Sequence, residues 1–149
     1  MVFSNGVLHH TPDIEKSFSE VHRVLKPGGD FWVIVYHRNS IFYWMSLWFV
    51  EHLLKLGFLK RSFKERLSMI EFSTSHELPI VNVYSRATLR NMLEQAGFSV
   101  SALWVRKLLR EDLPAIPLLN MFYNFIPQEV LDKAGKYFGW YLIALAHKT

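Results

Sequence analysis

The sequence contains no cysteine. This absence excludes disulfide bonds, thiolate nucleophiles and cysteine-based zinc sites, and it fits a cytoplasmic protein. Residues 1–10 also lack the basic start, long apolar stretch and cleavage pattern of a secretory signal peptide. No run of uncharged apolar residues is long enough for a membrane span. Even the most apolar stretch, residues 41–59, contains Glu51, His52 and Lys55. That stretch predicts an amphipathic helix lying on a core, a lipid surface or a partner rather than a membrane-spanning helix.

Composition places the chain among single globular domains. Its 149 residues are 50% hydrophobic, which is enough for one domain with a real core. The formal charge of +4 is mild, and no basic run alternates with stacking aromatics, so we expect no nucleic-acid partner. The histidines show no paired spacing of the HExxH type, so we predict no metal site.

The first forty residues predict a βαβ unit. Val2-Phe3 reads as a strand end, and a helix follows from a cap at Thr11 or Asp13. The helix stops at residues 26–29, Lys-Pro-Gly-Gly. Residues 31–36 are then continuously apolar, which is typical of a strand buried on both faces. Two strands joined by a helix in this way should be parallel, with a right-handed crossover.

Helices and strands continue to alternate along the rest of the chain. The predicted helices cover residues 40–60, 62–70, 85–96 and 128–138, and the predicted strands cover 98–107 and 140–146. Residues 72–83 are of mixed character, and residues 111–127 hold three prolines, which predicts loops with short helical pieces. This order of elements specifies an α/β layer fold.

Two motifs give the chain a family resemblance. The segment Ser4–Asp13, which contains Val-Leu-His-His, is followed by the segment Glu20–Gly29, which ends in Arg-Val-Leu-Lys-Pro-Gly-Gly. At this separation they resemble the C-terminal part of a class I S-adenosylmethionine-dependent methyltransferase of the type 11 kind. The resemblance implies a Rossmann-like doubly wound α/β sheet, truncated to strands 4 to 7 with a helical insert. It divides the chain into a βαβ core (1–38), a helical insert or acceptor cap (39–84) and C-terminal αβ units (85–149).

The resemblance also implies a site at the strand ends. The positions that match cofactor-lining residues are Ser4, Asn5, Val7 and His10. His10 matches a position near the transferred methyl group and is the candidate catalytic base. The candidate acceptor-binding residues are His9, Tyr36 and His37. Adjacent histidines cannot both face one site in a regular element, so one of them alternatively packs or caps the helix start. Tyr36 and His37 alternatively form an ordinary polar strand exit.

The part of the family's site that grips the cofactor is missing from this sequence. Gly28-Gly29 follows a helix and precedes a strand, the reverse of the order that aims backbone N–H groups at a ligand. We therefore expect a partial methyltransferase, inactive alone, whose complete domain uses S-adenosylmethionine and a small-molecule or lipid-type acceptor. The alternative is a non-catalytic interaction remnant.

Two surfaces are candidates for further contacts. The aromatic cluster in residues 42–49 is interpreted chiefly as core or interface. If it is exposed, it favours weak membrane-surface contact, aided by nearby basic residues. A sheet lacking half its strands also leaves an open edge, which predicts self-association.

Overall fold

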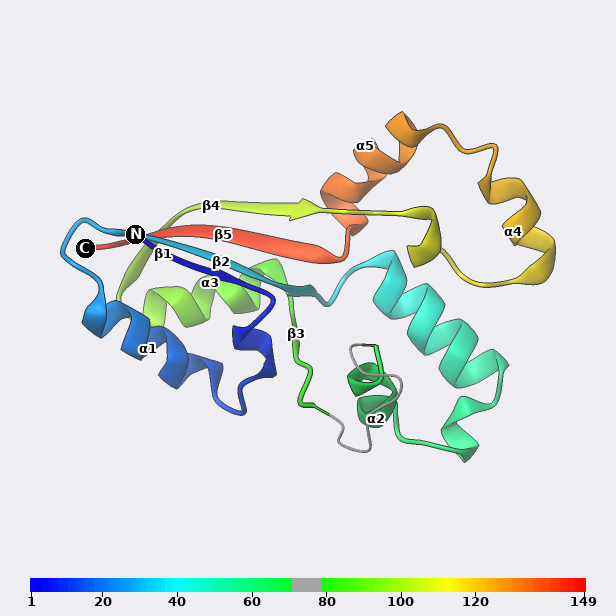
Figure 1. Cartoon of the computed structure of the whole chain (residues 1–149), viewed down its shortest axis with the longest axis horizontal. Helices are drawn as coiled ribbons and strands as arrows, with labels where there is room; N and C mark the ends of the chain where they lie inside the picture. Colours follow the sequence, from blue (N-terminus) through cyan, green and yellow to red (C-terminus); the bar gives the residue numbers. More distant parts are fainter. Residues whose placement is uncertain (71–78) are drawn as a thin grey trace.

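A mixed sheet forms one half of the molecule in the computed structural model, which describes residues 1–70 and 79–149. Its main path runs in the order β1 (Val2–Asn5), β2 (Asp30–His37), β5 (Tyr141–Lys148) and β4 (Phe98–Arg106) (Figure 1). A short strand, β3 (Val83–Tyr84), pairs with the end of β2. Strands β1 and β3 are parallel to β2, whereas β5 is antiparallel to both of its neighbours.

The predicted βαβ unit is confirmed. Helix α1 (Ile14–Val24) begins at Asp13, whose side chain accepts a hydrogen bond from the Lys16 N–H. After α1 the chain turns at Gly28, which has a φ of 72° and donates its N–H to the Lys148 carbonyl at 3.0 Å. Strand β2 then pairs with β1 in parallel. The Pro-Gly-Gly segment is therefore a structural turn tied to the last strand.

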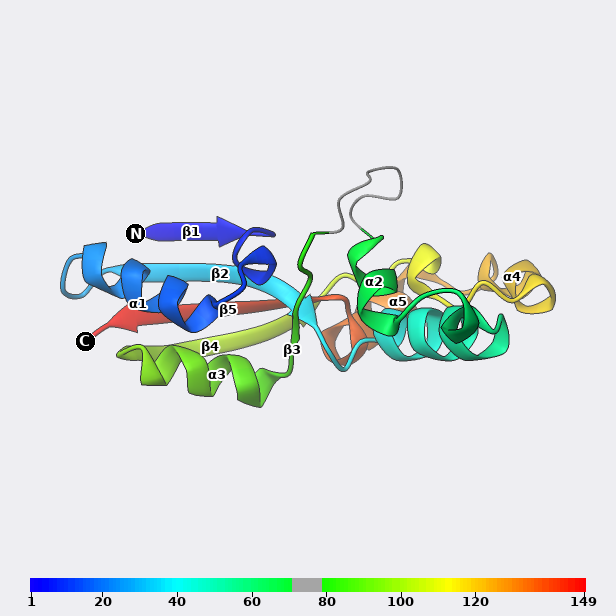
Figure 2. The ribbon, with the colours of Figure 1, turned by 90° about the horizontal axis from the view of Figure 1, so that it is seen from below.

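A second helix, α3 (Arg86–Gln95), lies beside α1 on the same face of the sheet (Figure 2). Its cap, Ser85, accepts a hydrogen bond from the Thr88 N–H, and Gly97 follows its end with a φ of 92°. Apolar side chains from both helices and four strands form the main core between the helices and the sheet. Its largest fully buried members are Phe18, Phe31, Leu89, Leu93 and Leu142.

One expectation for β2 is wrong. The strand was predicted to be buried on both faces, but its burial alternates. Phe31, Val33 and Val35 point toward the helices and are fully buried, whereas Trp32 and Ile34 remain partly exposed on the opposite face. The reason is that α1 and α3, the helices of the described residues that pack on the middle of the sheet, both lie on one side of it. A continuously apolar strand therefore has one open face here.

The other half of the molecule is a helical lobe (Figures 1 and 2). It contains η2 (Phe42–Leu54), η3 (Gly57–Leu59), α2 (Phe63–Ser68), η4 (Arg110–Asp112), α4 (Pro117–Tyr123) and α5 (Gln128–Phe138). The helix expected over residues 40–60 is shorter than predicted and is a π-helix. Its wide turns continue to the end, where the Lys55 N–H bonds the Val50 carbonyl at 2.9 Å. None of the helices in residues 1–70 and 79–149 is long and apolar enough to span a membrane.

The aromatic cluster at the start of η2 divides between the interior and the surface. Phe42 and Tyr43 pack against a second buried cluster that contains Tyr36 and Trp140. The core interpretation is wrong for Trp44, Trp48 and Phe49, which remain about 40% exposed. The lobe therefore has its own small core and also presents several large apolar side chains to solvent.

Candidate functional site

The candidate site begins where β1 ends. Gly6 leaves the strand with a φ of 69°, and its N–H bonds the Ile34 carbonyl of β2 at 3.2 Å. The chain then forms a single turn of 3-10 helix, η1 (Leu8–His10), closed by the Thr11 hydroxyl, which donates to the Leu8 carbonyl at 2.7 Å. This short turn fixes His9 and His10 above the carboxyl end of β1, the side of an α/β sheet where ligands bind.

His9 is an interior residue. Its side chain has no solvent exposure, and its ring lies 4.1 Å from the rings of both His10 and Tyr36, measured between centroids. Neither ring nitrogen has a hydrogen-bond partner among the described residues. Burial, helped by the neighbouring His10, lowers the pKa of His9 to about 4. His9 is therefore neutral at physiological pH and packs between two aromatic rings.

His10 is held in a defined orientation. Its Nδ1 lies 2.8 Å from the carbonyl oxygen of Ile80. A carbonyl can only accept a hydrogen bond, so Nδ1 carries the proton, and in the neutral ring Nε2 keeps a free lone pair. The same segment is fixed twice more, since Asn82 donates its N–H to the His9 carbonyl and its side-chain amide to the Thr11 carbonyl. An imidazole with a free Nε2 can accept a proton from a bound substrate.

The two predicted acceptor residues of β2 do not lie together. Tyr36 stacks on Trp140 with a centroid distance of 4.4 Å, and it contacts His9. His37 points to the opposite face, as successive strand residues must. It is buried, and its Nδ1 lies 3.1 Å from the Gly139 carbonyl. Burial lowers the pKa of His37, although this hydrogen bond opposes the shift.

The predicted cofactor-lining residues follow the free edge of β1. Asn5 and Val7 are exposed, and Val7 is 59% accessible. Ser4 is partly buried, and its hydroxyl oxygen is buried without a hydrogen-bond partner among the described residues. All three lie at or just after the carboxyl end of β1, with Ser4 and Asn5 on opposite faces of the strand, and their roles remain predictions.

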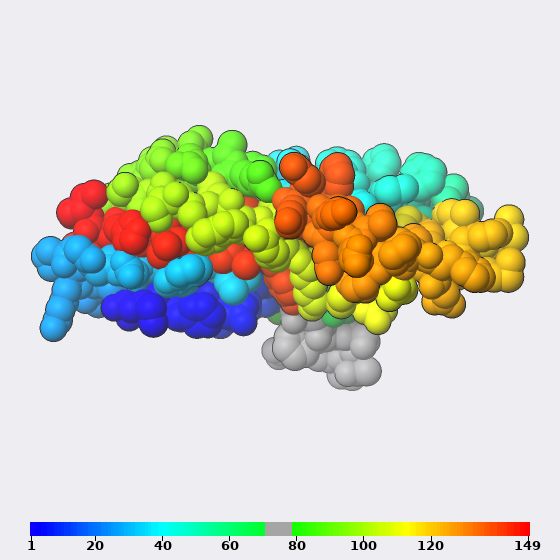
Figure 3. All heavy atoms as spheres, turned by 90° about the horizontal axis from the view of Figure 1, so that it is seen from above, coloured from blue at the N-terminus to red at the C-terminus, as the bar shows by residue number. Residues whose placement is uncertain are grey.

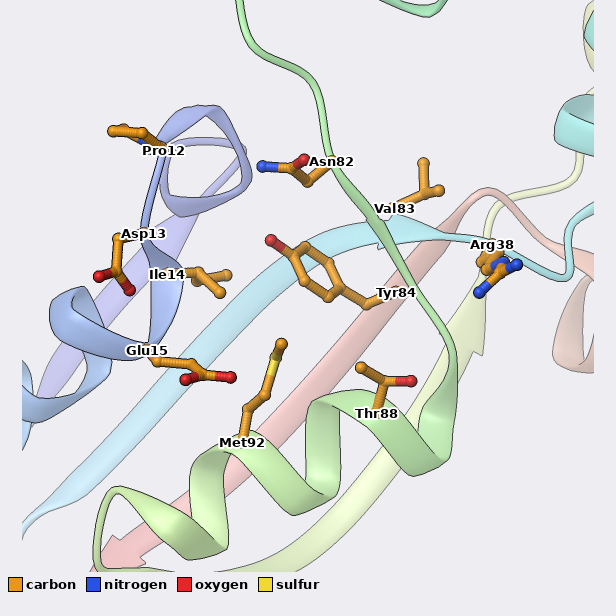
Figure 4. Close-up of a pocket in the computed structure, with 10 residues that line it drawn as sticks. All are labelled: Pro12, Asp13, Ile14, Glu15, Arg38, Asn82, Val83, Tyr84, Thr88 and Met92. Atoms are coloured by element: carbon orange, nitrogen blue, oxygen red, sulfur yellow. The ribbon is translucent and has the colours of Figure 1, made fainter. Parts of the chain in front are cut away.

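A cavity that the sequence did not reveal lies next to this rim. It has a volume of about 430 Å³ and sits between the start of α1, the segment 82–84 and α3 (Figure 4). The Tyr84 ring lies across it, with the hydroxyl directed toward Asn82 and the start of α1. Burial raises the pKa of Tyr84 to about 12, with a smaller increase from Glu15 and an opposing hydrogen bond from Asn82. The hydroxyl therefore stays protonated at neutral pH and can donate or accept a hydrogen bond.

The cavity combines apolar walls with charged side chains at its mouth. Its walls include Ile14, Val83 and Met92, while Glu15 and Arg38 supply charges of opposite sign. Among the described residues, no group of three or more histidine and carboxylate side chains is placed to hold a metal ion. The arrangement suits a small organic molecule with both apolar and polar parts.

Comparisons with known proteins agree on one class. Residues 1–33 match the family model described as a methyltransferase domain. The fold matches S-adenosylmethionine-dependent methyltransferases from Mesorhizobium loti (TM-score 0.53, 15% identity) and Thermotoga maritima (TM-score 0.53, 17% identity). It also matches the structure of the Haloferax volcanii Trm112 methyltransferase activator in complex with a proposed methyltransferase (TM-score 0.55, 19% identity). No curated protein matches the sequence significantly.

The chain has a class I methyltransferase-like fold. The predicted resemblance and the predicted fold class are thereby confirmed. The match covers 98% or 99% of this chain but only 52%, 60% and 55% of the Haloferax, Mesorhizobium and Thermotoga chains. The chain therefore spans between half and three-fifths of the length of these methyltransferases.

The residues of this methyltransferase-like chain fit one wall of a cofactor site. Asn5 is exposed at the end of β1 and offers a side-chain amide to a ligand, Val7 offers an exposed apolar contact, and the Ser4 hydroxyl is unpartnered among the described residues but buried. Gly28-Gly29 does not contribute, because it forms the turn between α1 and β2 at the other end of the sheet. The described residues thus offer contacts to one side of the cofactor and no glycine-rich turn for its carboxypropyl end.

Proposed function

We propose that this chain supplies the acceptor side of an S-adenosylmethionine-dependent methyltransferase acting on a small-molecule or lipid-type acceptor. One observation carries the proposal. The start of α1, the residue that follows β2 and the segment at β3 line a cavity that begins two residues after His10, and β1 and β2 are parallel, so their carboxyl ends lie on the same side of the sheet. Ligands of open α/β sheets bind at this end of the strands. The methyltransferase match over residues 1–33 includes β1 and η1, which build this rim.

Residue roles follow from the geometry. Asn5 and Val7 lie exposed on the rim of β1 and are proposed to contact the cofactor, together with Ser4. His10, with Nδ1 committed to Ile80, is proposed to take a proton through Nε2 where the acceptor must lose one. When bound, S-adenosylmethionine supplies a methyl group on a sulfonium, and the protein's main contribution is to hold the acceptor in line with it.

Acceptor binding is proposed to use the cavity beside η1. Tyr84 supplies a protonated hydroxyl there, and Met92 supplies a soft apolar wall. Tyr36 and His9 shape the other face of the rim by packing against each other. His37 faces away from them, so its proposed part is limited to positioning the end of β2 through the Gly139 carbonyl.

We further propose that the chain alone does not turn over substrate, because the described residues grip the cofactor on one side only. The test is a chimera that places the cofactor-binding N-terminal half of the Mesorhizobium methyltransferase before residue 1. The proposal expects S-adenosylhomocysteine to bind this chimera with micromolar affinity in isothermal titration calorimetry. A folded chimera that binds none would favour the alternative, a non-catalytic interaction module.

Two exposed valines provide a test position and a control for this experiment. Val7 lies on the proposed cofactor rim and is 59% exposed, while Val130 on α5 is 51% exposed and lies in the helical lobe. In the chimera, Val7→Asp should weaken binding about tenfold or more, a loss of about 1.4 kcal/mol. Val130→Asp should leave the affinity unchanged. Equal affinities for the two variants would contradict the proposed rim.

A further inference from the structure

The helical lobe presents two uncharged, aromatic-rich segments to solvent. Residues 41–50 of η2 and residues 113–128 around α4 contain no charged side chain. Many of their large apolar residues are exposed, among them Leu118 at 72% and Phe125 at 79%. The other exposed members are Trp44, Met45, Trp48, Phe49, Leu119, Met121 and Phe122. Together, these exposed apolar side chains of the two segments form the apolar tip.

The two segments belong to one end of the molecule. Figure 3 shows α4 in yellow-orange and η2 in cyan at the end farthest from the N-terminal strand. The Ser46 hydroxyl donates to the Asp112 carbonyl at 2.6 Å, which ties η2 to the loop leading to α4. Arg110 binds the carbonyls of Tyr123 and Ile126 and holds the far end of α4. The exposed side chains are thus presented by an ordered, hydrogen-bonded frame.

The apolar tip is distinct from the interior of the lobe. That interior is already filled by a cluster that includes Tyr36, Leu47, Leu67 and Trp140. Exposed apolar side chains gathered at one end of a molecule are of the kind that marks an interaction site. The candidate methyl-transfer site does not use them, since it lies at the ends of β1 and β2.

The positive charge of the segment that follows η2 indicates an anionic partner. From Leu53 to Lys64 the chain carries Lys55, Lys60, Arg61 and Lys64, and it stays net positive when the flanking Glu51, which pairs with Lys55, and Glu65 are included. All four basic residues are exposed, and they alternate with exposed leucine and phenylalanine side chains. Apolar side chains interleaved with basic ones are typical of segments that lie in the interface of an anionic bilayer. A second copy of this chain fits less well, because two copies would bring like charges together.

We propose that the apolar tip and this basic segment dock the protein on the surface of a membrane that contains anionic lipid. The aromatic and aliphatic side chains of η2 and α4 enter the interface, while Lys60, Arg61 and Lys64 contact lipid phosphates. The proposed contact is interfacial, and no helix of residues 1–70 and 79–149 is long and apolar enough to cross a membrane. This proposal stands independently of the methyl-transfer proposal.

The test is co-sedimentation of the full chain with vesicles of phosphatidylcholine alone and with about a third phosphatidylserine. We expect binding to the anionic vesicles to be much tighter. Each basic residue near an anionic surface raises the membrane partition coefficient about fivefold. We therefore expect the partition coefficient to fall about 100-fold in the triple variant Lys60→Gln, Arg61→Gln, Lys64→Gln. Leu118→Ser with Phe125→Ser, which alters exposed positions only, should reduce binding to both kinds of vesicle.

A charge-matched control separates this surface from net charge. Replacing Lys16, Arg23 and Lys26 with glutamine removes the same charge from exposed positions on and just after α1, at the other end of the molecule. This control should keep nearly wild-type vesicle binding, and circular dichroism should show that every variant is folded. Equal losses in both triple variants would overturn the proposal. So would a dimer, seen by sedimentation without lipid, that Leu118→Ser and Phe125→Ser convert to monomer, since the tip would then cover a second copy.

Discussion

Replacing His9 with phenylalanine should remove a specific acid sensitivity from the fold. His9 is completely buried between Tyr36 and His10, and its ring nitrogens have no hydrogen-bond partner among the described residues. Its pKa falls from 6.5 in the unfolded chain to about 4 in the folded protein, chiefly because burial disfavours the charged ring. Phenylalanine keeps an aromatic ring in the same place and cannot titrate.

The sign and size of the effect follow from proton binding. Below about pH 6.5 the unfolded chain takes up a proton at His9, while the folded protein does so only near pH 4, so stability falls as pH falls through this window. A difference of about 2.5 pKa units corresponds to about 3 kcal/mol at most. At neutral pH the His9→Phe variant should be as stable as wild type or slightly more stable, because two unpaired nitrogens leave the interior.

Urea unfolding followed by circular dichroism measures this directly. Wild type should lose about 3 kcal/mol more than the His9→Phe variant between about pH 7 and about pH 4. A His22→Phe control keeps His9 and should keep the acid-induced loss assigned to it. Parallel stability curves for wild type and His9→Phe would refute the placement of a neutral His9 in the interior.

Further substitutions test the fold and its open edge. Asp13→Ala removes the cap of α1 and should cost about 1 kcal/mol in urea unfolding; an unchanged midpoint would contradict that cap. Phe18→Ala empties a fully buried site and should cost about 3–5 kcal/mol, far more than any surface change. Gly97→Ala should cost about 1–3 kcal/mol, because φ is 92° and the new Cβ would lie 2.9 Å from Nε2 of His22. Phe3→Lys places a charge on the free edge strand β1 and should reduce the self-association we propose there; sedimentation velocity of wild type as a pure monomer would count against that edge contact.

Local signals in the sequence predicted the local structure well. Asp13 caps α1 and Ser85 caps α3 because their side chains satisfy N–H groups that the helix leaves free. Gly28 takes a left-handed backbone conformation at the Lys-Pro-Gly-Gly segment, where the helix was expected to stop. Each of these features depends on a few neighbouring residues, which a single sequence displays in full.

Long-range features were not predictable in the same way. Strand β5 inserts between β2 and β4 and runs antiparallel to both, although it comes last in the chain. Its place in the sheet is set by pairing with β2, which lies more than a hundred residues earlier in the chain, and with β4, and no local pattern encodes either contact. The π-helical form of η2 was likewise missed, because an apolar run predicts a helix without fixing the width of its turns.

The candidate site was predicted only in part. Sequence reasoning placed Ser4, Asn5, Val7 and the two histidines at one strand end, where the structure also places them. It missed Tyr84, because the cavity around this residue forms from α1, β3 and α3 together. It also grouped Tyr36 with His37, although adjacent strand residues point to opposite faces.

Titration of the isolated chain with S-adenosylhomocysteine tests the central claim most directly. The claim is that residues 1–149 form the acceptor side of a methyltransferase site and hold only one wall of the cofactor site. Isothermal titration calorimetry should therefore show no saturable binding by a chain that circular dichroism shows to be folded. Micromolar affinity for the isolated chain would contradict the account, because it would require a complete cofactor site within these residues.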